Sequence, residues 1–107
     1  MSNKVRNSPQ TQMDIDKLIH EPARLKILAQ LYVIESADFI FLMRQTGLTQ
    51  GNVSGHLTKL EAAEYVEIEK GYVGKRPHTM ISLTKKGRNA FKTYMQNIQQ
   101  VFNGLND

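Results

Sequence analysis

The sequence contains no cysteine, only three prolines and no hydrophobic run of membrane-spanning length. Without cysteine, a disulfide framework, a thiolate metal site and a cysteine nucleophile are all excluded. No apolar run approaches the roughly 18 residues that cross a membrane. The N-terminal stretch MSNKVRNSPQTQ also lacks the hydrophobic region of a signal peptide. We therefore expect a soluble, cytoplasmic protein with no membrane partner.

Catalytic motifs are missing as well. His20, His56 and His78 lie far apart in the sequence, and none belongs to an H-E-x-x-H pattern. The chain has no phosphate-binding loop, no nucleophile elbow and no dinucleotide fingerprint. We therefore predict that the protein is not an enzyme and needs no cofactor or metal. A histidine metal site shared between two copies stays open as an alternative.

The basic residues are concentrated in one part of the chain. The 107 residues suit a single domain with one modest core. Residues 1–64 carry seven basic and seven acidic side chains, whereas residues 65–92 carry seven basic side chains against two glutamates. That excess of five, less Asp107, gives the net charge of +4. Such clustering is typical of a nucleic-acid footprint, and a solvated basic face without a partner is the alternative.

The N-terminal part of the chain predicts a polar arm followed by a helix. Residues 1–13 are polar, and we expect them to form a flexible arm. Apolar residues then recur at helical spacing from Ile15 to Tyr32. Pro22 suits a first helical turn, where its missing N–H costs little, so the helix should begin near Glu21 or Pro22.

Two further helices follow with a very short connection. Asp38 is placed to cap the second helix, which Gly47 ends. Thr49 is placed to cap a third helix over residues 49–62. Two helices joined by a turn of three or four residues that contains glycine are typical of the helix-turn-helix motif.

The remainder of the chain predicts a β-hairpin and a final helix. The segments YVEIEKGY and PHTMISLT alternate in polarity, and a glycine-rich basic tip over residues 71–77 joins them. Thr84 is placed to cap a last helix that runs towards Leu105. The predicted fold class is therefore mainly α with a β-hairpin wing, a winged helix-turn-helix.

The predicted helix over residues 49–62 has a side almost free of large side chains. Its apolar residues share one face at 100° per residue: Val53, Leu57 and Leu60. The opposite side holds Gly51, Asn52, Ser54, Gly55, Thr58 and Lys59. Glycine costs a helix interior roughly 1 kcal/mol relative to alanine. These two glycines therefore need a functional reason.

Close approach to DNA is the reason that we favour. An α-helix fits the major groove, where side chains near its N-terminus reach the base edges. Gln50 and Asn52 carry amides that can pair twice with adenine, and the backbone amides of Gln50 and Gly51 favour a phosphate. A surface helix that is merely small and polar is the alternative, although alanine, glutamate and lysine would stabilise it better.

Basic residues beside this helix predict further contacts. Arg76 on the hairpin tip is expected to enter a minor groove, and Lys75 to meet a phosphate. An ordinary exposed turn is the alternative. Lys85, Lys86 and Arg88 open the last helix, where positive charge opposes the helix dipole. Phosphate contact and solubility explain these three equally well.

The last helix predicts a dimer interface. Its apolar stripe is longer than a small winged domain needs for its own core: Phe91, Tyr94, Met95, Ile98, Phe102 and Leu105. We expect a second copy to cover this stripe, although it can also fold back on the first helix. A symmetric dimer would place two recognition helices about one DNA turn apart on a palindromic site. The expected division is an arm over 1–13, a DNA-binding domain over 14–90 and a dimerisation helix over 91–107.

Two segments together resemble the small winged helix-turn-helix transcriptional regulators of the MarR and ArsR groups. They are LTQGNVSGHLTKLEAAEYVEIEK, with its LE-x-x-x-YV junction, and RPHTMISLTKKGRNAF, with its LT-x-x-G entry to the last helix. The resemblance covers roughly residues 21–95. The metal-sensing ArsR proteins use cysteine-rich helices, which this chain lacks. The segment GYVGKRPHT also departs from the usual MarR wing.

The resemblance implies a cytoplasmic DNA-binding regulator that is commonly a homodimer. It assigns wing contacts to Lys75 and Arg76. It assigns base and phosphate contacts to Thr49, Gln50, Asn52, Ser54, His56, Thr58 and Lys59. The expected function is a sequence-specific regulator, a homodimeric repressor on double-stranded DNA, with a small-molecule effector as a further candidate partner. The alternative is a winged-helix protein-interaction module that does not bind DNA.

Overall fold

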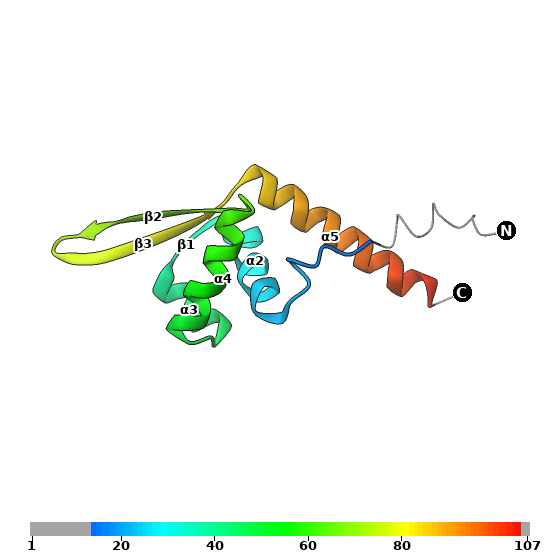
Figure 1. Ribbon diagram of the computed structural model, residues 1–107, viewed down its shortest axis with the longest axis horizontal. Coiled ribbons are helices and arrows are strands. Elements are labelled where there is room, and N and C mark those ends of the chain that lie inside the picture. Colours follow the sequence, from blue (N-terminus) through cyan, green and yellow to red (C-terminus); the bar gives the residue numbers. More distant parts are fainter. Residues whose placement is uncertain (1–13, 106–107) are drawn as a thin grey trace.

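The computed structural model describes residues 14–105, which form a winged helix-turn-helix (Figure 1). The expected flexible arm over residues 1–13 lies outside the described residues. In chain order the elements are α2 (Pro22–Ile34), β1 (Ser36–Asp38), α3 (Phe39–Thr46), α4 (Gln50–Ala62), β2 (Val66–Val73), β3 (Arg76–Leu83) and α5 (Lys85–Gly104). The predicted fold class, mainly α with a hairpin wing, is confirmed.

α2, α3 and α4 begin where the sequence predicted, at Pro22 and after the caps Asp38 and Thr49. The side chain of Glu21 accepts a hydrogen bond from the Arg24 amide, so α2 starts at Pro22 as predicted. Asp38 caps α3 and Thr49 caps α4 in the same way. The apolar residues from Ile15 to Ile19 do not extend α2, because residues 17–19 form a turn instead.

The helix-turn-helix connection is as short as expected. Gly47 ends α3 in the left-handed conformation, with φ at 73°, where a Cβ would be strained. Thr46 is buried just before it, and its hydroxyl donates to the Leu42 carbonyl and accepts from the Leu48 amide. These bonds fix the turn from which α4 departs.

The sheet has one strand more than the sequence indicated. The short β1 pairs with β3, which also pairs with β2, giving an antiparallel order β1-β3-β2. We did not predict β1, because three residues are too few to show an alternating pattern. The wing strands reach one residue nearer the tip than predicted, since β2 ends at Val73 and β3 starts at Arg76. Only Gly74 and Lys75 form the turn, with Gly74 at a φ of 64°.

A single hydrophobic core lies between the helices and one face of the sheet. Its buried side chains are Ile19, Ile27, Leu28, Leu31, Ala37, Leu42, Val53, Leu57, Leu60, Val66, Ile81, Phe91 and Tyr94. The predicted core face of α4 is therefore confirmed. Only the first part of α5 packs on this core, and its remainder runs away from the domain (Figure 1). The expected boundary between residues 90 and 91 falls inside this continuous helix.

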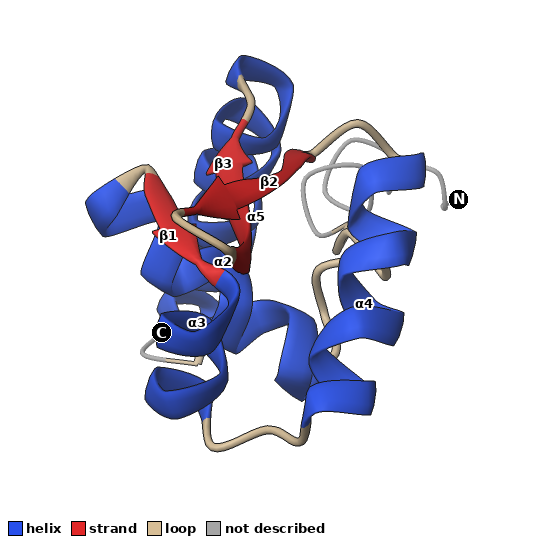
Figure 2. Cartoon of the chain, turned by 90° about the vertical axis from the view of Figure 1, so that its left-hand side faces the viewer, coloured by secondary structure: helices blue, strands red, loops and turns tan. Residues whose placement is uncertain are grey.

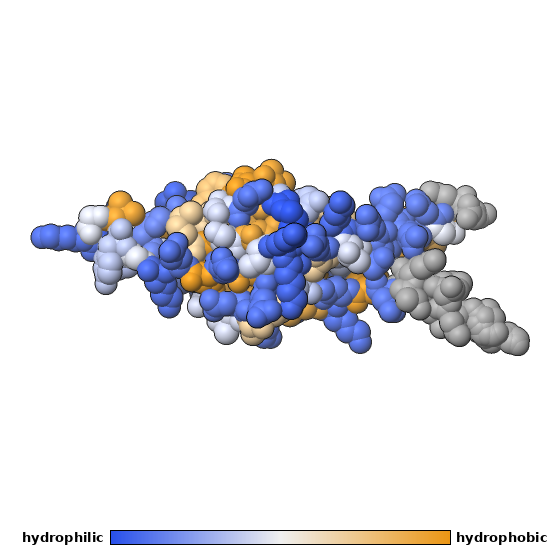
Figure 3. Space-filling view, turned by 90° about the horizontal axis from the view of Figure 1, so that it is seen from above, coloured by the Kyte–Doolittle hydropathy of each residue, from blue (hydrophilic) through white to orange (hydrophobic). Residues whose placement is uncertain are grey.

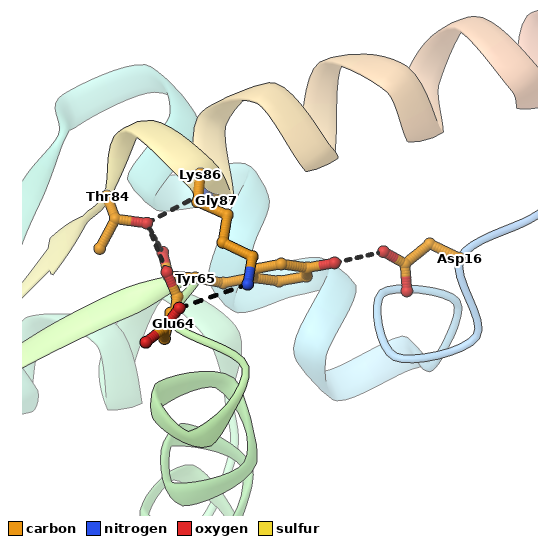
Figure 4. Close-up of polar contacts among 6 residues, drawn as sticks. All are labelled: Asp16, Glu64, Tyr65, Thr84, Lys86 and Gly87. Carbon is orange, nitrogen blue, oxygen red and sulfur yellow. Dashed lines mark hydrogen bonds and ion pairs between the residues drawn. The ribbon is translucent and has the colours of Figure 1, made fainter.

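A close backbone contact locks α5 onto the end of α4 (Figure 4). The Thr84 hydroxyl lies 2.7 Å from the Glu64 carbonyl, to which it donates, and it accepts from the Gly87 amide at 2.9 Å. Gly87 is buried directly against Tyr65, whose carbonyl oxygen would lie 2.1 Å from a Cβ at this position. The glycine of the LT-x-x-G pattern is therefore required for packing.

The same junction holds the start of the described chain. The Tyr65 hydroxyl donates to the Asp16 carboxylate at 2.7 Å (Figure 4). Burial, together with the hydrogen bond and negative charge of Asp16, raises the pKa of Tyr65 to about 12. Asp16 also accepts from the backbone of the turn at Leu18 and Ile19. Tyr65 thus links the N-terminal turn, α4 and the sheet.

We predict that Gly87→Ala destabilises the fold by about 1–3 kcal/mol, the usual cost of overpacking. The new methyl group would force α5 away from the Tyr65 backbone. Urea denaturation measures the change, with Gly104→Ala as the matched control because a Cβ there meets nothing. Equal stability of the two variants would contradict a packing role for Gly87.

Candidate nucleic-acid interface

The bare side of α4 faces outward. Figure 2 shows α4 at one edge of the domain, with no other described helix or strand on its outer side. Seven of the eight predicted helix contacts are exposed: Thr49, Gln50, Gly51, Asn52, Ser54, Thr58 and Lys59. The eighth, His56, is half-buried. The side opposite the core is therefore available along the full length of α4.

The glycines of α4 have no packing role among the described residues. A Cβ added at Gly51 or Gly55 meets no atom within 4 Å, and neither residue has the positive φ that favours glycine. Both positions would accept alanine, which is a better helix former. The structure therefore gives no internal reason for them, in contrast to Gly87.

A groove separates α4 from the wing. Its lining includes Gln50, Ser54, Thr58 and Glu61 of α4, Lys70, Pro77 and Thr79 of the wing, and the start of α3 at Phe39 and Ile40. Because side chains alternate between the faces of a strand, Lys70 lies on the same face of the sheet as Ile68 and Val66. Its cross-strand partner Thr79 shares that face. The groove thus continues the exposed side of α4 onto the wing.

The other edge of α4 borders the start of α2. Asn52, His56 and Lys59 succeed one another at helical spacing along it. The Nδ1 atom of His56 lies 3.1 Å from the Arg24 guanidinium, and Glu21 lies 3.9 Å from the same nitrogen. The hydrogen bond from the Arg24 amide, and then the nearby charges, lower the pKa of Glu21. Tertiary structure therefore places a further cation, Arg24, beside the predicted contacts.

The wing is basic towards its end. Residues 70–77 include three cations and no acidic residue. Lys75 occupies the turn, and Arg76 pairs with Val73 on the face opposite to Lys70. Sequence reasoning did not select Lys70 as a contact, because only the pairing of β2 with β3 shows which strand residues face α4.

The basic start of α5 is largely engaged within the chain. The Lys86 ammonium lies 3.4 Å from Glu64. Arg88 lies 3.3 Å from the Glu35 carboxylate, and its guanidinium stacks over the Tyr32 ring at 4.9 Å. Lys85 is exposed. Packing and ion pairing therefore account for two of the three cations without an external phosphate.

The predicted dimer stripe divides into two parts. Phe91 and Tyr94 are buried in the core of their own chain, where Phe91 packs on Tyr32 and the Tyr94 hydroxyl contacts His20. Ile98 packs at the edge of that core. The exposed fractions of the others are 38% for Met95, 58% for Phe102 and 76% for Leu105. The stripe is thus most exposed at its C-terminal end, at Phe102 and Leu105, with Met95 partly exposed nearer the core.

The histidines do not converge on one site. His20 contacts Tyr94, His56 contacts Arg24, and His78 lies 3.9 Å from Asp38. Within residues 14–105 no group of three histidine, aspartate or glutamate side chains is arranged to hold a metal ion. In the same part of the chain no helix has the length and apolar character to cross a membrane.

Comparisons with known proteins agree with this geometry. An uncharacterized protein of Methanocaldococcus jannaschii is 42% identical over 85 residues, which cover 79% of this chain and 92% of the relative. The structure of a transcriptional regulator homologue from Pyrococcus horikoshii superposes with a TM-score of 0.82 at 26% identity, covering 92% of this chain and 97% of the other. A MarR family transcriptional regulator from Silicibacter pomeroyi shares the fold, with a TM-score of 0.65 at 18% identity over 96% of this chain and 70% of its own.

The predicted resemblance to winged helix-turn-helix regulators is therefore confirmed. Residues 23–102 match the family described as the winged helix DNA-binding domain. This range includes α4, the whole wing and nearly all of α5. The chain belongs to the family of winged helix DNA-binding domains.

Proposed function

We propose that the protein is a cytoplasmic, sequence-specific transcriptional repressor that binds double-stranded DNA as a homodimer. The observation that carries this proposal is the exposed side of α4, where two glycines occupy helix positions that have room for a side chain. A partner that needs the helix backbone to come close explains why alanine is absent there. The major groove of DNA is such a partner, because its width of about 12 Å just admits an α-helix.

In this function α4 is the recognition helix. Asn52 and Gln50 lie in its first turn, where side chains reach base edges. Their amides suit adenine. Thr49, Ser54, Thr58 and Lys59 supply phosphate contacts, which set the position of the helix on the duplex.

The wing extends the contact to the neighbouring groove. Lys75 in the turn meets a phosphate, and the long side chain of Arg76 reaches into a minor groove, whose negative potential attracts a guanidinium. Lys70 faces α4 across the groove between them and adds a further phosphate contact. The concentration of cations in this segment complements the charge of the duplex.

The exposed part of the α5 stripe supports the homodimer. The C-terminal end of α5 extends beyond the core of its own chain (Figure 1). It carries the exposed Phe102 and Leu105, and Met95 is partly exposed nearer the core. A symmetric pair of such helices would bury these side chains and place two copies of α4 on the two halves of a palindromic operator.

We predict that binding to duplex DNA weakens steeply with added salt and that two variants separate base reading from phosphate contact. Asn52→Ala should reduce the preference for one base pair over the others, at one position of the site, by about 1–3 kcal/mol of binding free energy. Lys75→Ala should weaken binding to all sequences alike. Affinities for a duplex selected from a random pool and for random duplex, measured across a salt series, test both variants.

Two results would contradict this proposal. An absence of salt-dependent binding to any duplex pool would favour the protein-interaction module instead. An equal loss of affinity on selected and random DNA for Asn52→Ala would remove its reading role.

We also predict that Gly55→Ala raises stability and weakens DNA binding. The gain is about 1 kcal/mol, because the methyl group meets open space within the chain. The loss is about tenfold or more in affinity, since the same methyl group separates α4 from the groove. Thermal unfolding and DNA titration measure the two effects, with exposed Thr93→Ala on α5 as the control. A stabilised variant with unchanged affinity would show that the bare face serves another purpose.

For the dimer, we predict that Phe102→Glu converts the protein to a monomer, because a charge would be buried at the centre of the paired α5 helices. Analytical ultracentrifugation should give twice the chain mass for the wild type and for the control Gln96→Glu. It should give the mass of one chain for Phe102→Glu. A wild-type protein that sediments as a single chain at micromolar concentration would refute the dimer.

A further inference from the structure

The wing ends in two large side chains that the domain does not cover. Tyr72 is 74% exposed and Val73 is 60% exposed, although both lie in a regular strand. In Figure 3 the tip of the wing, at the left, is hydrophilic at its end with a small hydrophobic spot directly behind it. Single exposed hydrophobic residues are common. Tyr72 differs from such residues in its position relative to α4.

Tyr72 lies on the face of the wing that is directed towards α4. It is two residues beyond Lys70 and four beyond Ile68, so all three share one face of the ribbon. Its cross-strand partner is Pro77, which also lines the groove next to α4. Val73 and Arg76 occupy the opposite face. Tyr72 therefore projects directly towards a duplex held against α4, whereas the long Arg76 side chain would reach it around the edge of the ribbon.

The tip is also at a suitable distance from the domain. At about 3.3 Å per residue, the four residues from Ile68 to Tyr72 carry the ring about 13 Å beyond the core edge. This distance is close to the roughly 12 Å width of a major groove. With α4 in a major groove, the ring would reach the sugar-phosphate backbone of the DNA strand that separates this groove from the adjacent minor groove.

We propose that Tyr72 is an aromatic wedge, which inserts at the edge of the minor groove and stacks against a base step while neighbouring cations hold the backbone. Apolar wedges of this kind partly unstack a step and bend the duplex. Lys70 and Lys75 flank the ring and meet the phosphates. This inference rests on the proposed DNA binding, and it adds sensitivity to a deformable step beyond the bases that α4 reads.

The absence of tryptophan from the chain allows a direct test. Tyr72→Trp introduces a single tryptophan at the tip, and Thr93→Trp, at an exposed position on α5, is the matched control. On titration with a duplex selected from a random pool, the Tyr72→Trp protein should lose fluorescence and become shielded from acrylamide as the indole stacks on bases. The Thr93→Trp protein should bind equally well without either change.

A second measurement separates stacking from charge. Tyr72→Ala should weaken binding about tenfold, as expected for a lost base-aromatic contact. The slope of the logarithm of affinity against that of salt concentration should stay the same. Lys75→Ala should instead reduce this slope by about 0.9, the value for one phosphate contact. Circular-permutation gels should show less bending with Tyr72→Ala than with the wild type.

Specific outcomes would overturn the wedge. Tight duplex binding with unchanged Tyr72→Trp fluorescence, or an unweakened Tyr72→Ala variant, would refute it while leaving the proposed function intact. Quenching that depends on protein concentration without DNA would assign Tyr72 to a contact between two copies. A wild-type protein that binds no duplex would refute the wedge and the proposed function together.

Discussion

The burial of one face of α4 is the constraint on which the candidate interface depends. Val53, Leu57 and Leu60 are almost completely buried. Rotating α4 to expose them would cost about 1.5–3 kcal/mol for each side chain. A domain is stable by only about 5–15 kcal/mol in total, so the core allows a single orientation. The glycine-bearing side is consequently held outward.

The two kinds of glycine in this chain illustrate how packing and function can be separated. Gly87 has the Tyr65 backbone where its Cβ would be, and the fold needs it. Gly51 and Gly55 have empty space around them and lower the stability of α4. A residue that weakens its own element without a structural reason points to a requirement imposed by a partner. This contrast is the strongest physical argument for the proposed close approach of DNA to α4.

The junction between α4, β2 and α5 relates the parts of the interface to one another. Thr84 and Gly87 bind α5 to the backbone at Glu64 and Tyr65, where α4 has just ended and β2 is about to begin. Tyr65 also holds the turn at Asp16. Since α4, the wing and α5 all leave from this point, its rigidity sets the angle between α4 and the wing. The same contact sets the direction in which the exposed stripe of α5 extends.

The sequence by itself determined the elements with strong local signals. Pro22 marked the start of α2 through its fixed φ and missing N–H. The caps at Asp38 and Thr49 and the stop at Gly47 depend on backbone groups a few residues away, so local signals alone located α3 and α4. The sequence also selected the exposed side of α4, because the helical period separates Val53 from the glycines.

Tertiary structure decided the features that depend on distant partners. The strand β1 is too short for a pattern and exists only because β3 pairs with it. The apolar stripe of α5 looks uniform in sequence, yet Phe91 and Tyr94 enter the core while Phe102 does not, because α2 covers only the first part of the helix. The proposed roles of Lys70 and Tyr72 likewise depend on the register of the hairpin, which places both on the face towards α4. Residues close in sequence determine the helix caps and the helical repeat of apolar residues. Which side chains are buried, and which face α4, depends on the distant segment that packs against them.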